Sequence, residues 1–168
     1  MTHQYRRVVT GHTADGESTV LFDSFLPLIE QDGSGAGARQ EDRAGAASSV
    51  VWTTQGFPAN NDDPSDAGLR KVHTAESDGT VLRIVQYAPG VTPRHHRTDS
   101  VDYGVILSGS IEMELDTETV KLNTGDLLVQ RGTVHNWMNN STEPCLIAYI
   151  LIGANSVMIN GIALPATG

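Results

Sequence analysis

Two histidines and one aspartate occur at positions from which they could bind a metal ion together. His96 and Asp102 belong to one extended stretch, and alternate side chains of an extended chain share a face, so both can point inward with Thr98 between them. His135 comes from a second, later stretch. Two imidazoles and one carboxylate suit a divalent first-row metal and leave coordination positions open for a substrate. The residue types therefore predict a metal centre at His96, Asp102 and His135.

The elements that must position these side chains are β-strands. Short runs rich in β-branched residues follow one another along the chain and are separated by turn pairs such as Asp78-Gly79 and Ser108-Gly109. No stretch of useful length keeps apolar residues at helical spacing. This pattern predicts an all-β sandwich or barrel. The expected strands cover residues 7–10, 19–22, 49–52, 81–87, 101–107, 111–115, 120–122, 127–130 and 145–152.

The length of 168 residues predicts a single domain, 1–168. We expect its core barrel to cover residues 68–152, with the N-terminal strands added at the edge. The segment 31–49 is rich in glycine and alanine and has almost nothing to bury, so we expect a flexible loop there.

The charge and the cysteine content exclude several classes of protein. The chain has 11 Lys and Arg against 20 Asp and Glu, a net charge of −9, which disfavours nucleic acid as a partner. Cys145 is the only cysteine, so no intrachain disulfide can form. No apolar run is long enough for a membrane-spanning helix, and no secretion signal is visible. We therefore expect a cytoplasmic protein that binds neither nucleic acid nor membrane.

The spacing of the histidines resembles the two motifs of the cupin superfamily. The first motif is matched by Gly90, His96, Asp102 and Gly109, with Asp in place of Glu and with Thr98 where the family has its second histidine. The second motif is matched by Gly125, Gly132, His135 and Asn139, with Gln130 in place of proline. The stretches 96–103 and 129–135 resemble in particular small single-domain bacterial and fungal cupins.

The resemblance implies a double-stranded β-helix, a jelly-roll barrel that encloses one divalent transition metal such as Zn, Fe, Mn, Ni or Cu. With Thr98 in the second histidine's place, the four protein ligands of the family fall to three here: His96, Asp102 and His135. Thr98, Gln130 and Trp137 are expected to line the pocket and contact a small-molecule substrate. His95 is expected to face away from the pocket, because its neighbour in the extended chain faces inward.

The resemblance also implies a function. The leading hypothesis is a metal-dependent enzyme of secondary metabolism that acts on a small oxygenated organic molecule, as a lyase of the dehydratase type or an isomerase. An Fe(II)-dependent dioxygenase and a non-catalytic small-molecule-binding cupin are the alternatives. No general acid or base is assigned, because strand register decides which of the candidates points inward: Tyr87, Tyr103, Glu112 or Tyr149. We expect a homodimer formed through the N-terminal strands.

Overall fold

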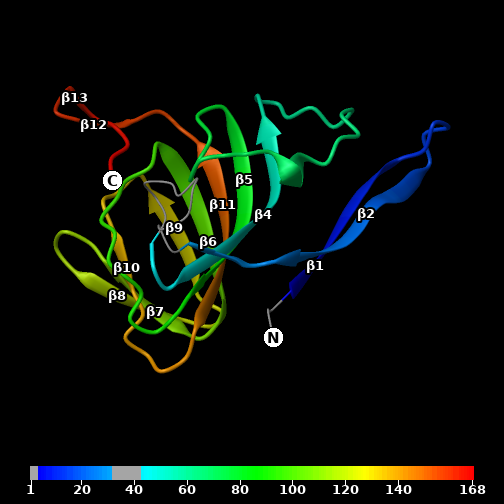
Figure 1. Ribbon diagram of the computed structural model, residues 1–168. Helices are drawn as coiled ribbons and strands as arrows, with labels where there is room; N and C mark the ends of the chain where they lie inside the picture. Colours follow the sequence, from blue (N-terminus) through cyan, green and yellow to red (C-terminus); the bar gives the residue numbers. More distant parts are fainter. Residues whose placement is uncertain (1–3, 32–42) are drawn as a thin grey trace.

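The computed structural model describes residues 4–31 and 43–168 and consists almost entirely of antiparallel strands (Figure 1). A large sheet has the strand order β3-β4-β5-β11-β6-β9, and a small sheet has the order β10-β7-β8. The strands of the large sheet are β3 (Ile29–Gln31), β4 (Ala46–Gln55), β5 (Gly79–Tyr87), β11 (Cys145–Gly153), β6 (Ser100–Ser108) and β9 (Leu127–Arg131). Those of the small sheet are β10 (Asn136–Met138), β7 (Ser110–Glu114) and β8 (Thr119–Asn123).

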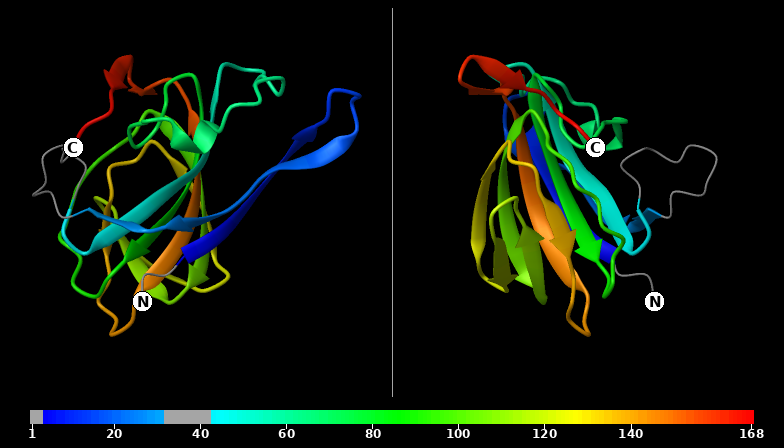
Figure 2. Two further views of the ribbon diagram at one scale, coloured as in Figure 1. Left: turned by 45° about the vertical axis from the view of Figure 1, so that its right-hand side comes forward. Right: turned by 90° about the vertical axis from the view of Figure 1, so that its left-hand side faces the viewer.

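The two sheets pack against each other and share one core (Figure 2). In β5 every second residue is buried, as expected for a strand with one face toward the core. Val81 and Ile147 of the large sheet belong to the same buried cluster as Ile111 and Leu122 of the small sheet. The expected all-β jelly-roll barrel is therefore confirmed.

The N-terminal hairpin stands apart from the barrel. Its strands, β1 (Gln4–His12) and β2 (Ser18–Pro27), pair only with each other among the described residues, and the hairpin projects away from the sheets (Figure 1). An ion pair between Arg7 and Asp66, 2.6 Å long and almost buried, ties its base to the loop before the short 3₁₀ helix η1 (Ala67–Leu69). Only the later strands β3 and β4 extend the large sheet as expected for the N-terminal strands.

The C-terminal segment forms a second small hairpin, β12 (Val157–Ile159) with β13 (Ile162–Leu164). After it, the backbone of Thr167 forms a β-bridge with Arg97 and so brings the end of the chain beside the segment that carries His96. In the part of the chain that is described, no helix is long and apolar enough to cross a membrane.

The prediction of a flexible loop over residues 31–49 is wrong at both ends of that segment. Gln31 is the last residue of β3, and residues 46–49 begin β4. Residues 32–42 lie outside the described residues. The small side chains of Ala46 and Ala47 are buried, and their backbones pair with β5 opposite Tyr87 and Gln86. Backbone hydrogen bonds to a neighbouring strand therefore make a strand where large apolar side chains are missing.

Candidate metal and substrate site

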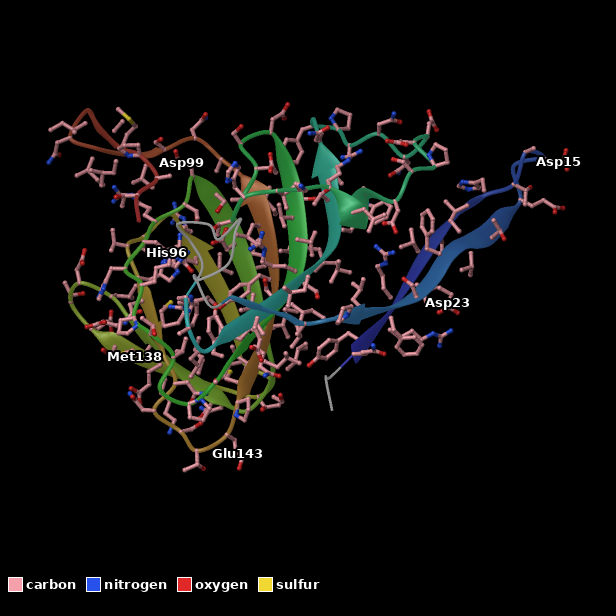
Figure 3. All side chains as sticks on the ribbon, viewed as in Figure 1. Asp15, Asp23, His96, Asp99, Met138 and Glu143 are labelled. Atoms are coloured by element: carbon pink, nitrogen blue, oxygen red, sulfur yellow. The ribbon has the colours of Figure 1, made fainter. Side chains whose placement is uncertain are left out.

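The candidate site is a cavity of about 70 Å³ between the two sheets. Every residue predicted to bind metal or substrate lines it: His96, Thr98, Asp102, Gln130, His135 and Trp137. Asp102 comes from β6, Gln130 from β9 and Trp137 from β10. Figure 3 shows the labelled His96 within the barrel, far from the hairpin that carries Asp15 and Asp23.

His96 and His135 are brought together by a β-bridge. The amide nitrogen of each residue donates to the carbonyl oxygen of the other, at 3.0 Å in both directions. The bridge places the two rings side by side, with 4.2 Å between their centroids. Because residues in such a pair share one face of the ladder, both imidazoles enter the same cavity.

The two imidazoles are oriented in the same way. Nδ1 of His96 donates to the carbonyl oxygen of Arg94 at 3.1 Å, and Nδ1 of His135 donates to that of Thr133 at 3.1 Å. With the proton on Nδ1, the lone pair lies on Nε2. This backbone anchoring is the usual arrangement of histidines that bind metals through Nε2.

Burial keeps both rings neutral. It is the main cause that lowers the pKa of His96 from 6.5 to about 3, and the nearby His135 and the positive charge of Arg94 contribute to this shift. Burial likewise lowers the pKa of His135 to about 4, and the charges of Arg43 and Arg94 act in the same direction. Neutral imidazoles are the form that binds a metal ion, and both are present in that form at neutral pH.

Asp102 lines the cavity but does not form a cluster with the two histidines. Its carboxylate accepts hydrogen bonds from the hydroxyl of Ser100 at 2.5 Å and from that of Thr98 at 3.5 Å. Burial raises its pKa, and both hydroxyls and the charge of Arg83 oppose that shift. Within residues 4–31 and 43–168, no three His, Cys, Asp or Glu side chains are grouped as a metal site. The structure thus brings two of the three expected ligands together.

The three expected substrate contacts form the walls around the histidines. The side-chain amide nitrogen of Gln130 contacts both ring nitrogens of His135, Nδ1 more closely than Nε2, from which it lies 3.2 Å away. The indole of Trp137 meets His135 edge to face, with ring centroids 5.7 Å apart. Thr98 is buried beside Asp102. His95 faces outward as expected, where its exposed ring lies 3.1 Å from Glu114.

Two of the four acid–base candidates point inward. Tyr87 and Tyr149 line the cavity, and their hydroxyl oxygens lie 3.4 Å apart. Burial raises the pKa of Tyr149 well above its ordinary value, with a further contribution from Tyr87, so its hydroxyl stays protonated. Tyr103 is exposed, and Glu112 accepts a hydrogen bond from the amide of Asn140 on the surface.

Three arginines of the cavity wall were not predicted from the sequence: Arg43, Arg83 and Arg94. Arg83 could have been found, because it has the same parity as Tyr87 in a strand whose alternation is regular. Arg43 and Arg94 lie outside regular strands, where parity indicates no direction.

Comparison with known proteins identifies the family. The family model described as Cupin domain matches residues 83–152, which include both histidines and Asp102. The chain is 33% identical over 162 residues to the cupin-domain-containing oxidoreductase fogC of Aspergillus ruber, covering 92% of this chain and 75% of that protein. It is 34% identical over 167 residues to the oryzines biosynthesis cluster protein J of Aspergillus oryzae, covering 94% of this chain and 88% of that protein. On its fold and on these relatives, the chain belongs to the cupin family.

Proposed function

We propose that this protein is a metal-dependent cupin enzyme of secondary metabolism that acts on a small oxygenated organic molecule. The observation that carries the proposal is the pair of neutral, backbone-anchored imidazoles of His96 and His135 in one cavity. The relatives support the biological setting, because fogC is named an oxidoreductase and protein J is named for a biosynthesis cluster.

The residues of the cavity fit a divalent transition metal such as Zn, Fe, Mn, Ni or Cu. His96 and His135 offer two nitrogen ligands whose other ring nitrogens are held by carbonyl oxygens. Asp102 is the proposed third ligand, since it is the carboxylate among the described residues that line the same cavity. When bound, the metal would supply Lewis-acid stabilisation of negative charge on a substrate oxygen.

The protein's own groups can supply the proton transfer. The hydroxyl of Tyr149 is buried, stays protonated at neutral pH and lines the cavity, so it can donate a hydrogen bond to the oxygen of a leaving hydroxyl group. Tyr87, in contact with it, can relay the next proton. A protonated donor beside a Lewis-acid site favours a lyase of the dehydratase type or an isomerase.

A second candidate is an Fe(II)-dependent dioxygenase. Several relatives are named oxidoreductases, among them fogC, virC of Hypocrea virens and srdD of Neurospora crassa. Two histidines and one carboxylate are also the ligand set of Fe(II) oxygenases.

The deciding experiment is turnover with and without dioxygen. The protein is loaded separately with each of the five metals and incubated with a pool of small hydroxy and keto acids, and the products are identified by mass spectrometry. A lyase releases water from a substrate in both atmospheres, and Tyr149→Phe lowers its rate by about 100-fold or more. A dioxygenase forms product only with dioxygen. If no metal gives turnover, the enzyme proposal is replaced by the non-catalytic binding protein.

A further inference from the structure

Asn136 is a buried polar side chain that points away from the cavity. It is 1% exposed, and it comes between His135 and Trp137, which both line the cavity. Because successive side chains of an extended chain point to opposite faces, the amide of Asn136 points the other way. A buried amide needs a partner for its oxygen and for its nitrogen, since leaving either one unpaired costs free energy. The partners of Asn136 therefore show what this side chain holds in place.

Two hydrogen bonds fix the amide of Asn136 in one orientation. Its Oδ1 accepts from the backbone N–H of Arg94 at 2.8 Å, and its Nδ2 donates to Oε2 of Glu114 at 3.1 Å. The hydrogen bond from Asn136 lowers the pKa of Glu114, which is an ionised carboxylate at neutral pH. A backbone N–H can only donate and a carboxylate can only accept, so the amide cannot be reversed. Asn136 thus ties the backbone of Arg94 to the small sheet, where it pairs with Glu114.

The segment that Asn136 holds has no strand ladder of its own. Residues 91–95 lie between β5 and β6 and form no regular strand, so contacts such as this one must fix their position. Glu114 also lies 3.1 Å from the ring of His95, but both side chains of that pair are well exposed, at 40% and 59%. A pair in water contributes little. The buried hydrogen bond from Asn136 is therefore the stronger restraint on this segment.

The residue that Asn136 holds is also the one that orients His96. The carbonyl oxygen of Arg94 accepts the hydrogen bond from Nδ1 of His96 at 3.1 Å, and Asn136 binds the N–H of the same residue. A displacement of the backbone at Arg94 would move this carbonyl oxygen and leave the imidazole without its anchor. Groups that hold the second nitrogen of a metal-binding histidine fix both the tautomer and the direction of the ring.

We propose that Asn136, supported by Glu114, is a positioning residue that fixes the ring of His96 for metal binding. It acts through the backbone of Arg94 and touches neither the metal nor the substrate. The inference rests on the proposed function in that His96 is a ligand of the proposed metal centre. Its effect on the ring itself, however, is present before any metal binds, and it can be measured separately.

The tautomer of His96 is the direct readout, and it is measured in the metal-free protein. Long-range ¹H–¹⁵N correlation spectra with a chelator present distinguish rings protonated on Nδ1 from rings protonated on Nε2. The spectrum of His96→Gln identifies the signals of His96 among those of the six histidines. In the wild type His96 should be protonated on Nδ1. In Asn136→Leu, which keeps the bulk of the side chain and removes both hydrogen bonds, it should become a mixture of the two tautomers.

Zinc titration calorimetry measures the consequence for the metal site. Asn136→Leu should bind Zn²⁺ about tenfold or more weakly than the wild type, the usual cost of removing a group that orients a ligand. Glu114→Leu should weaken binding in the same direction, because it leaves Nδ2 of Asn136 without its acceptor. Glu114→Gln keeps an acceptor oxygen at this place and should bind Zn²⁺ as the wild type does. This recovery separates a positioning role from a general loss of packing.

The matched control is Asn140→Leu. Asn140 donates to Oε2 of Glu112 at 2.8 Å, so it forms the same type of bond to the same strand, β7, but on the surface and away from the segment before His96. It should leave the tautomer of His96 and the affinity for Zn²⁺ unchanged. Thermal unfolding of each variant shows whether it is folded. If Asn136→Leu does not fold, the comparison of Glu114→Leu with Glu114→Gln decides.

Two results would overturn the inference. They are a variant without the bond of Asn136 that keeps both the wild-type tautomer and the wild-type affinity for Zn²⁺, and an Asn140→Leu variant that loses as much affinity as Asn136→Leu. Failure of the proposed function gives a different result. A wild-type protein that takes up no Zn²⁺ or other metal, but whose His96 changes tautomer in Asn136→Leu, would remove the metal centre and leave the positioning of the ring standing.

Discussion

The neutral imidazole pair links the stability of the protein to pH. In the unfolded chain both rings take up protons near pH 6.5, whereas in the folded protein the pKa values are about 3 for His96 and about 4 for His135. The unfolded state therefore binds more protons between these limits, and stability must fall as the pH falls. The raised pKa of Asp102 acts in the opposite direction, because a buried carboxyl group favours the protonated form that low pH supplies.

We predict that the metal-free protein loses stability as the pH is lowered from about 7 to 4, by roughly 3 kcal/mol for each of the two rings before the offset from Asp102. Urea unfolding at a series of pH values measures the slope. His135→Gln removes one of the two titrating rings and should give a shallower slope. An equal slope in both proteins would show that burial of the ring does not control this titration.

At the scale of residues, the sequence predicted where the site lies better than how it is arranged. The parity of His96, Thr98 and Asp102 was sufficient to place all three in one cavity. It could not show that Ser100 and Thr98 bind the carboxylate of Asp102, because those contacts depend on side-chain rotamers. The inward position of Tyr87 and Tyr149 similarly depends on the registers of β5 and β11, which no local pattern specifies.

The turns between strands are the elements on which the barrel depends most directly. Gly109 joins β6 to β7 with a φ of 76°, and a Cβ atom there would lie 2.5 Å from the carbonyl oxygen of Pro144. Gly125 lies in the turn between β8 and β9 with a φ of 92°, but no heavy atom lies within 4 Å of its Cβ position. A substitution at Gly125 therefore measures the cost of the positive φ alone, whereas one at Gly109 measures that cost together with a steric clash.

We predict that Gly125→Ala destabilises the protein by about 1 kcal/mol, the cost of a left-handed alanine. Gly109→Ala should cost about 3 kcal/mol or more, since the backbone at Pro144 must also move. Chemical denaturation measures both values. Equal losses would mean that the turn at Gly109 relaxes without disturbing β11.

The base of the N-terminal hairpin depends on a buried ion pair. Arg7 and Asp66 are 6% and 14% exposed, whereas the neighbouring pair of Arg6 and Asp23 is 60% and 47% exposed. We predict that Asp66→Asn destabilises the protein by about 3 kcal/mol, because the charge of Arg7 stays buried without its carboxylate. The matched change Asp23→Asn should cost less than about 1 kcal/mol. Similar values from urea unfolding would mean that the hairpin is not held by this pair.

At the scale of elements, local patterns identified most strands but not their partners. The alternation of buried and exposed residues in β5 could be predicted from the sequence, as could the turn at Gly109. The strand β4 was partly missed because Ala46 and Ala47 have no β-branched side chain, and their strand conformation comes from pairing with β5. The separation of β1 and β2 from the sheet edge likewise depends on long-range contacts.

For the whole molecule, the exposed apolar side chains of β2 and β3 form the surface through which we expect the homodimer to assemble. Val20 is 53% exposed and Phe25 is 61% exposed on β2, and Ile29 is 67% exposed on β3. We predict that sedimentation equilibrium gives twice the chain mass of 18.0 kDa and that Phe25→Glu lowers it to the chain mass. Leu127→Glu, on the exposed β9, is the control and should remain dimeric. A wild-type mass of 18.0 kDa would contradict the homodimer.

The cavity is a property of the whole molecule, because its charged groups come from distant parts of the chain. Arg43 precedes β4, Arg83 lies within β5 and Arg94 lies between β5 and β6. The sequence predicted the barrel that brings such segments together, but the gathering of three arginines beside the histidine pair became visible only in the closed fold.

The account depends most on the binding of a divalent metal by His96 and His135. Elemental analysis of the purified protein, after incubation with Mn, Fe, Ni, Zn or Cu and removal of unbound ion, measures this directly. We predict about one equivalent of metal per chain for the wild type and a large loss of it for His135→Ala, with His95→Ala, whose ring is exposed, retaining it. A wild-type protein that takes up none of the five metals, or a His135→Ala variant that binds as much as the wild type, would contradict the proposed metal centre.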